Sequence, residues 1–197
     1  MIILASGSPR RAEILQRHGV QFIAEAADID ETPLPDEPAP NYVLRLAIEK
    51  AQSRLSILKD RNFKLVLAAD TSVVVEETIL GKPKSFEDFA SMMDRLSGKV
   101  HQVHSGVAVI SEDKPVDTIL ATTHVGFRQI TEAEILSYWQ SGEPKDKAGG
   151  YAIQGLAAEF VRSLEGSYSN VVGLPIFETM QLLHEWGIAS HLNKASD

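Results

Sequence analysis

Strand-like and helix-like segments alternate along almost the whole 197-residue chain, and this order constrains the fold more than any other feature. The patterns predict about seven strands and five helices in intermingled order, without an internal repeat or a low-complexity linker. Such alternation is typical of α/β proteins, whereas separate runs of strands and helices are typical of α+β proteins. We therefore predict an α/β fold with a mixed sheet and flanking helices. An arrangement of two lobes beside a cleft would be compatible with this order of elements.

The chain opens with a predicted strand, a tight turn and a helix. Residues 2–6 are apolar or small, which is typical of a buried strand. Ser8 and Pro9 then match the preferred N-cap and first helical residues. The following pattern predicts a helix over residues 9–18, and Gly19 is placed to end it.

An acidic, proline-rich loop precedes the second predicted helix. Residues 28–40 contain four prolines and five acidic residues, a composition that resists regular structure and belongs on the surface. Apolar residues at helical spacing predict an amphipathic helix over residues 41–58, with Lys50 near its apolar face. A short apolar strand over residues 64–70 then ends abruptly in a carboxylate.

The remaining pattern alternates between strands and helices up to a last helix. A serine or threonine three residues before an acidic residue indicates capped helices over residues 86–96 and 132–140. The other predicted elements are a hairpin-like continuation at 73–80, strands at 100–110, 116–128, 151–154 and 160–164, a loop at 166–173, and a helix that Pro175 opens and Gly187 ends.

The composition excludes several kinds of chemistry. The chain has no cysteine, so it forms neither disulfides nor thiolate metal sites. Its formal net charge of -8 disfavours binding to nucleic acids or anionic membranes, which basic patches normally mediate. No run approaches the roughly 18 apolar residues of a membrane span. Met1 is followed directly by the first predicted strand, without the basic region or the small-residue cleavage site of a signal peptide. We therefore expect a cytoplasmic protein in which any small anionic ligand needs a local basic pocket.

The turn from Ser6 to Arg11 is the first candidate site. Small residues and two guanidinium groups stand at a predicted helix N-terminus, where free N–H groups and the helix dipole favour an anion. Arg10 and Arg11 add a fork geometry that suits phosphate. A capped surface helix with two solvated arginines would explain the same residues. Neither a Walker A pattern nor a GxGxxG pattern occurs in the sequence.

Asp70 and Thr71 form the second candidate site. They stand at the predicted carboxyl end of an apolar strand, where ligand crevices form in open α/β sheets. A carboxylate there could hold a magnesium ion or accept a proton from water. It could equally cap the following turn. Glu31 in the acidic loop is a candidate second carboxylate, although most acids in such loops are solvated.

Lysines beside glycines or on a helix face add further positive charge. They are Lys50, Lys82 and Lys147. None of them indicates a site by itself. Together with Arg10 and Arg11 they supply the local charge that an acidic protein needs to hold a triphosphate, provided that the fold brings them together.

Two other arrangements are disfavoured. His101 and His104 are three residues apart on a predicted strand, so their side chains would point to opposite faces. Ser167, Ser169 and His184 lack the GxSxG setting of a serine nucleophile. We therefore expect neither a histidine metal site nor a serine-triad hydrolase.

Six segments together resemble the Maf family of nucleotide pyrophosphatases. They extend from residue 4 to residue 175 in the family's order, so the resemblance covers nearly the whole chain and is highly specific in combination. The segments are LASGSPRR at 4–11, EKA at 49–51, ADT at 69–71, GKP at 81–83, DKAGGYAIQG at 146–155 and NVVGLP at 170–175.

The resemblance implies one domain over residues 1–197, with a mixed α/β fold and two lobes around a deep cleft, similar to inosine triphosphate pyrophosphatases. It also implies hydrolysis of a nucleoside triphosphate between its α and β phosphates, with a divalent metal cation, Mg²⁺ or Mn²⁺. Asp70 would accept the proton of the attacking water and, with Glu31, lie on the metal side. The residues expected around the triphosphate are Ser6, Arg11, Lys50, Lys82 and Lys147.

Three further residues match positions associated with substrate choice in the branch that resembles dTTP and UTP pyrophosphatases: Arg10, Thr71 and Gln154. A sister branch that prefers 7-methyl-GTP looks different at the Arg10 position and around Gln154. A glutamine amide offers a donor and an acceptor together, which suit the N3–H and O4 edge of uracil or thymine. The resemblance therefore predicts hydrolysis of dTTP and UTP to the monophosphate and pyrophosphate.

Two alternatives stay open at this point. Modified uridine or cytidine nucleotides are candidate substrates, because the same catalytic groups would act on them. The other hypothesis is a non-catalytic nucleotide-binding regulator of cell division or septum formation, since the family has been linked to septum inhibition. We expect no nucleic-acid or membrane partner. The sequence does not determine the oligomeric state, and a homodimer is compatible with it.

Overall fold

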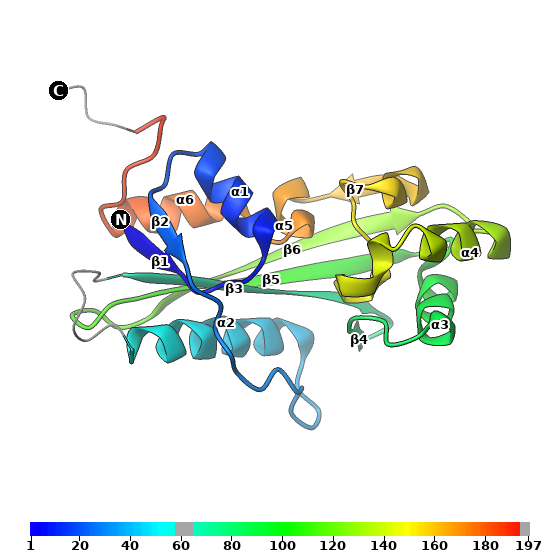
Figure 1. Ribbon diagram of the computed structural model, residues 1–197, viewed down its shortest axis with the longest axis horizontal. Coiled ribbons are helices and arrows are strands. Elements are labelled where there is room, and N and C mark those ends of the chain that lie inside the picture. Colours follow the sequence, from blue (N-terminus) through cyan, green and yellow to red (C-terminus); the bar gives the residue numbers. More distant parts are fainter. Residues whose placement is uncertain (58–64, 194–197) are drawn as a thin grey trace. The chain divides into compact units, whose positions relative to one another are not determined.

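The computed structural model (Figure 1) describes residues 1–57 and 65–193. The contacts of these residues divide into two compact units. Within the described residues, the first unit is formed by Met1–Asp70, Ser105–Ala121 and Gly173–Asp197, and the second by Thr71–His104 and Thr122–Val172. The helix that was predicted to end at residue 58 ends at Leu55, whereas residue 58 itself and the predicted strand start at residue 64 lie outside the described residues.

A mixed sheet forms the centre of the fold. Among the described residues it has seven strands, in the order β2-β1-β3-β5-β6-β7, with β4 paired to β3. β1 is parallel to β2 and β3, whereas β4 is antiparallel to β3 and β7 is antiparallel to β6. The predicted α/β class with a mixed sheet is therefore confirmed. The strands are β1 (Ile2–Leu4), β2 (Phe22–Ala24), β3 (Val66–Val75), β4 (Thr78–Leu80), β5 (Val100–Ile110), β6 (Asp117–Phe127) and β7 (Val161–Glu165).

Helix boundaries follow local capping chemistry. At the start of α3, the Asp88 N–H donates to Ser85 Oγ at 3.2 Å. At the start of α4, Thr131 and Glu134 form a complete capping box. Both helices have their predicted bounds. The helices are α1 (Pro9–Arg17), α2 (Ala39–Leu55), α3 (Phe86–Leu96), α4 (Glu132–Gln140), α5 (Tyr168–Val172) and α6 (Ile176–Glu185), with short 3-10 helices η1 (Glu143–Asp146), η2 (Ala148–Gly150) and η3 (Leu156–Phe160).

Helices cover both faces of the sheet in the first unit, α1 and α6 on one face and α2 on the other (Figure 1). The alternation of side chains along a strand explains this arrangement. In β3, Leu67 and Ala69 pack in the cluster that contains residues of α1 and α6, whereas Val66 and Ala68 pack in the cluster that contains Ala47 of α2. Both faces are buried at β1, whose three residues are all apolar, whereas β3 also contains polar residues at positions 70 to 72.

An aromatic cluster forms the core of the second unit. The Phe89 ring of α3 stacks on Trp139 of α4, with 5.2 Å between ring centroids. His101 is buried beside the Phe127 ring, at 4.8 Å, and its Nε2 lies 2.8 Å from the Tyr151 hydroxyl. Among the described residues of both units, no helix combines the length and the apolar character that crossing a membrane requires.

One predicted element ends later than expected, and two others are wrong. The strand that was predicted to end at Asp70 continues as β3 for five more residues, and its last three residues pair with β4, which confirms the hairpin-like continuation predicted at 73–80. Residues 151–154 form turns and coil rather than a strand, since Gly149 and Gly150 before them take φ angles of 66° and 71° and turn the chain. The predicted loop at 166–173 contains the short helix α5.

Candidate functional site

Asp70 lies in the middle of β3 and faces α2. Its side chain is on the same side of the strand as Val66 and Ala68, and only 11% of it is exposed. Lys50, on the buried side of α2, donates from Nζ to Asp70 Oδ1 at 2.7 Å. The packing of α2 on the sheet therefore brings a buried ammonium and a buried carboxylate together.

Lys50 also joins the acidic loop to this pair. Its Nζ lies 2.6 Å from Glu31 Oε1, and 49% of the Glu31 side chain is exposed. The loop backbone is held at the same place, because the Tyr42 hydroxyl of α2 donates to the Glu31 carbonyl oxygen at 2.9 Å. One ammonium thus lies between two carboxylates, one from a buried strand and one from a surface loop.

Arg11 lies in the first turns of α1 and is half-buried. Its Nε donates to the Gly173 carbonyl oxygen at 2.7 Å, and its Nη1 donates to Ser6 Oγ at 3.2 Å. The same Ser6 oxygen accepts from the Ser8 N–H at 3.2 Å. These contacts orient the guanidinium, whose charge acts on Asp70.

The electrostatics of this cluster suit a proton acceptor. Burial raises the pKa of Asp70 above its ordinary value, and the charges of Lys50 and Arg11 oppose that shift. A carboxylate that is more basic than usual accepts a proton from water more readily. Burial lowers the pKa of Arg11 and Asp70 opposes this, but an arginine stays charged at neutral pH. Burial, with the charges of Asp70 and Glu31, raises the pKa of Tyr42 to about 12, so its hydroxyl remains a donor.

The second unit brings together the two loops that carry Lys82 and Lys147. The Gly149 N–H donates to the Gly81 carbonyl oxygen at 2.9 Å, which ties the loops backbone to backbone. Lys82 is exposed, whereas only 14% of the Lys147 side chain is exposed and its Nζ pairs with Asp146. The two loops that carry these lysines therefore lie side by side.

The three residues that were predicted to select the substrate occupy different parts of the chain. Arg10 is half-buried on α1 in the first unit. Thr71 follows Asp70 in β3, and because successive strand side chains point to opposite faces, the two lie on opposite sides of the sheet. Gln154 is exposed in the turn before η3.

The predicted convergence of basic side chains on Asp70 is seen within the first unit for Lys50 and Arg11. The approach of Lys82 and Lys147 to the same carboxylate stays a prediction. Among residues 1–57 and 65–193, no three histidine, aspartate or glutamate side chains form a group that could hold a metal ion.

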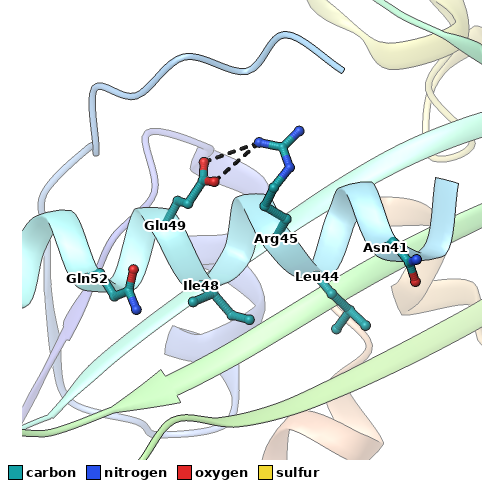
Figure 2. A pocket seen from close by; sticks show the side chains of 6 residues that line it. All are labelled: Asn41, Leu44, Arg45, Ile48, Glu49 and Gln52. Carbon is teal, nitrogen blue, oxygen red and sulfur yellow. Dashed lines mark hydrogen bonds and ion pairs between the residues drawn. The ribbon is translucent and has the colours of Figure 1, made fainter. Parts of the chain in front are cut away.

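Sequence reasoning missed Tyr42 and Arg45, which contact the acidic loop from α2. Arg45 Nη2 donates to the Thr32 carbonyl oxygen at 3.2 Å, next to Glu31. Figure 2 shows Arg45 and Glu49 pointing toward one another on α2. The sequence feature that could have indicated these contacts is the helical spacing of the two residues beside a loop rich in acids.

A shallow depression on this helix is lined by Asn41, Leu44, Arg45, Ile48, Glu49 and Gln52.

Known proteins resemble the chain over most of its length. The family described as Maf-like protein matches residues 1–186. A dTTP/UTP pyrophosphatase from Pseudoalteromonas atlantica is 51% identical over 190 residues, which cover 96% of this chain and 98% of the relative. A dTTP/UTP pyrophosphatase from Vibrio parahaemolyticus is 50% identical over 185 residues, which cover 94% of this chain and 96% of the relative.

Solved structures with low sequence identity share the fold. The Ham1 protein of Staphylococcus aureus aligns with a TM-score of 0.51 at 13% identity, covering 94% of this chain and 98% of that chain. A HAM1 protein from Coxiella burnetii aligns with a TM-score of 0.50 at 16% identity, covering 93% and 98%. The match over residues 1–186, with relatives about half identical in sequence, shows that this chain belongs to the Maf-like protein family.

Proposed function

We propose that this protein hydrolyses dTTP and UTP to the nucleoside monophosphate and pyrophosphate. The observation that carries the proposal is the buried Asp70 carboxylate, 2.7 Å from the Lys50 ammonium that also contacts Glu31. A carboxylate held beside fixed cations can accept a proton from water while the cations offset charge on phosphate. The relatives named dTTP/UTP pyrophosphatase, 51% and 50% identical to this chain, favour these two substrates.

In this mechanism a water oxygen forms a bond to the α-phosphorus, and the bond to the oxygen that bridges the α and β phosphates breaks. Asp70 accepts the proton of the attacking water. Lys50 and Arg11 offset negative charge on the triphosphate and on the departing pyrophosphate. Further phosphate contacts come from Ser6, Lys82 and Lys147.

The carboxylates of Glu31 and Asp70 fit a divalent cation. They contact the same ammonium, at 2.6 and 2.7 Å, so their oxygens lie near one another. Mg²⁺ is usually held by one or two carboxylates together with substrate phosphates, and Mn²⁺ also prefers oxygen ligands. Glu31 and Asp70 would hold such an ion, which when bound supplies positive charge against the triphosphate.

Substrate choice rests on a base edge that the two nucleotides share. Uracil and thymine differ at C5, whereas both present N3–H and O4. A glutamine amide offers the matching acceptor and donor, so Gln154 is assigned to this edge. Arg10 and Thr71 are assigned to the same selection. Modified uridine nucleotides that keep N3–H and O4 are compatible with this assignment.

A pyrophosphate-release assay tests the proposal. The panel contains dTTP, UTP, modified uridine triphosphates and the purine triphosphates, each with Mg²⁺ and with Mn²⁺. We expect Asp70→Asn to lower kcat by about 100-fold or more and to change KM little, because it removes the proton acceptor and retains the cations. The matched control is Asp94→Asn, which changes an exposed carboxylate of α3 and should leave kcat unaltered.

Two outcomes would contradict the proposal. Unchanged turnover in Asp70→Asn would remove Asp70 from the reaction. Nucleotide binding by the wild-type protein without release of pyrophosphate from any triphosphate would favour the non-catalytic regulator instead.

A further inference from the structure

The loop that carries Glu31 has no regular structure of its own. Residues 25–38 contain neither a helix nor a strand. The ion pair between Glu31 and Lys50 is half exposed on the Glu31 side, and such pairs contribute little to the ordering of a chain. The position of the Glu31 carboxylate therefore depends on other contacts that hold this loop.

Arg45 of α2 provides the densest set of these contacts. Its Nε and Nη2 donate to the two carboxylate oxygens of Glu37, each at 2.7 Å. Nη2 also donates to the Thr32 carbonyl oxygen at 3.2 Å. Nη1 donates to both Glu49 carboxylate oxygens at 3.3 Å, which fixes the guanidinium against its own helix (Figure 2). A planar fork that is paired in this way orients its partners as well as binding them.

Burial and a further hydrogen bond extend this network into the loop. Only 8% of the Glu37 side chain and 21% of the Arg45 side chain are exposed, although Glu37 lies in an acidic surface segment. Glu37 Oε2 also accepts from the Leu34 N–H at 3.0 Å. Arg45 thus holds the loop at Thr32 and at Glu37. The Tyr42 hydroxyl holds it one residue before Thr32, at the Glu31 carbonyl oxygen.

We infer that Arg45, together with Tyr42, is a positioning residue that holds the Glu31 loop on α2 so that the Glu31 carboxylate stays beside Lys50 and Asp70. Neither residue touches the reacting atoms in this role. The inference deepens the proposed function and rests on it where it assigns Glu31 to the metal side of the triphosphate.

Arg45→Lys tests the inference, because lysine keeps the charge and most of the stem but cannot form the fork. Arg54→Lys makes the same change near the end of α2 and is the matched control. In the nucleotide-free protein, we expect Arg45→Lys to speed amide exchange at Leu34. In UTP hydrolysis, we expect it to raise the half-activating Mn²⁺ concentration about tenfold, as loss of an outer-shell partner does, with kcat at saturating Mn²⁺ retained. Arg54→Lys should change neither quantity.

A double substitution separates positioning from a general structural effect. If Arg45 acts through Glu31, Arg45→Lys adds no further rise in the half-activating Mn²⁺ concentration to a Glu31→Gln protein. Tyr42→Phe, which removes only a hydroxyl, should also raise the half-activating Mn²⁺ concentration. This variant replaces Arg45→Lys as the test if Arg45→Lys does not fold.

The inference would be overturned if the rises in half-activating Mn²⁺ concentration caused by Arg45→Lys and Glu31→Gln multiply in the double variant. It would also be overturned if amide exchange at Leu34 is unaltered in Arg45→Lys. If the wild-type protein releases no pyrophosphate, the proposed function fails, and the exchange at Leu34 still decides whether Arg45 holds the loop.

Discussion

Replacement of Lys50 by methionine would show how strongly the first unit depends on a shared positive charge. Lys50 is 7% exposed and Asp70 is 8% exposed. The Lys50 ammonium contacts Asp70 at 2.7 Å and Glu31 at 2.6 Å. Methionine retains much of the apolar stem and adapts to irregular space, so the substitution removes mainly the charge.

The expected cost follows from the burial of the partners. Removal of one member of a buried ion pair costs about 3–5 kcal/mol, because the other charge is left buried without compensation. Arg11 continues to act on Asp70, which places the cost at the lower end of that range. The pair with Glu31, whose side chain is 49% exposed, contributes about 1 kcal/mol or less. We expect Lys50→Met to lower the free energy of unfolding at pH 7 by about 3 kcal/mol.

Urea denaturation at pH 7 measures this cost, followed by tryptophan fluorescence and circular dichroism. Trp186 packs against the core of the first unit, so its emission reports on the part of the chain that holds Lys50. Asp70→Asn is the matched control: Lys50 then keeps Glu31 as a partner, and the cost should be about 1 kcal/mol. A cost for Lys50→Met below that of Asp70→Asn would refute the reasoning.

Two further predictions concern the second unit. Gly150→Ala should lower the free energy of unfolding by about 3 kcal/mol, because φ is 71° and the new Cβ would lie 2.8 Å from the Phe89 ring. Gly142→Ala should lower it by only about 1 kcal/mol, because φ is 80° but no atom lies within 4 Å of the new Cβ. Equal losses in thermal denaturation would contradict this. Burial lowers the pKa of His101 to about 4 from 6.5, so the unfolded chain binds its proton at higher pH and stability should fall as pH decreases from about 6.5 to 4. An imidazole NMR titration with a midpoint near 6.5 would exclude this.

Local chemistry explains which helices could be predicted from the sequence. The capping box of Thr131 and Glu134 is complete within four residues, and α4 begins where that box indicates. The position of Lys50 on the apolar face of α2 was visible in the same way, because helical periodicity alone determines it. Such features need no information from distant parts of the chain.

Contacts between distant segments explain what could not be predicted. The hairpin of β3 with β4 was predicted, but the apolar run at 64–70 does not specify that it and the hairpin form one unbroken strand through Asp70. Glu31 stands among several acids of similar surroundings in the sequence. Only the contacts of the folded chain, with Lys50 and with the Tyr42 hydroxyl, distinguish it from Asp28 or Asp30. Residue spacing contains no trace of those contacts, and the family resemblance supplied the assignment.

The hydrogen bond from Arg11 to the Gly173 carbonyl joins residues 162 positions apart in the chain. A ribosome adds roughly 5–20 residues per second, so Arg11 waits for many seconds before that carbonyl is synthesised. Helix α6, which packs over the same face of the sheet as α1, emerges later still. The apolar face of the sheet that α6 covers therefore stays uncovered in the nascent chain until α6 has been synthesised, so the first unit is completed after the second.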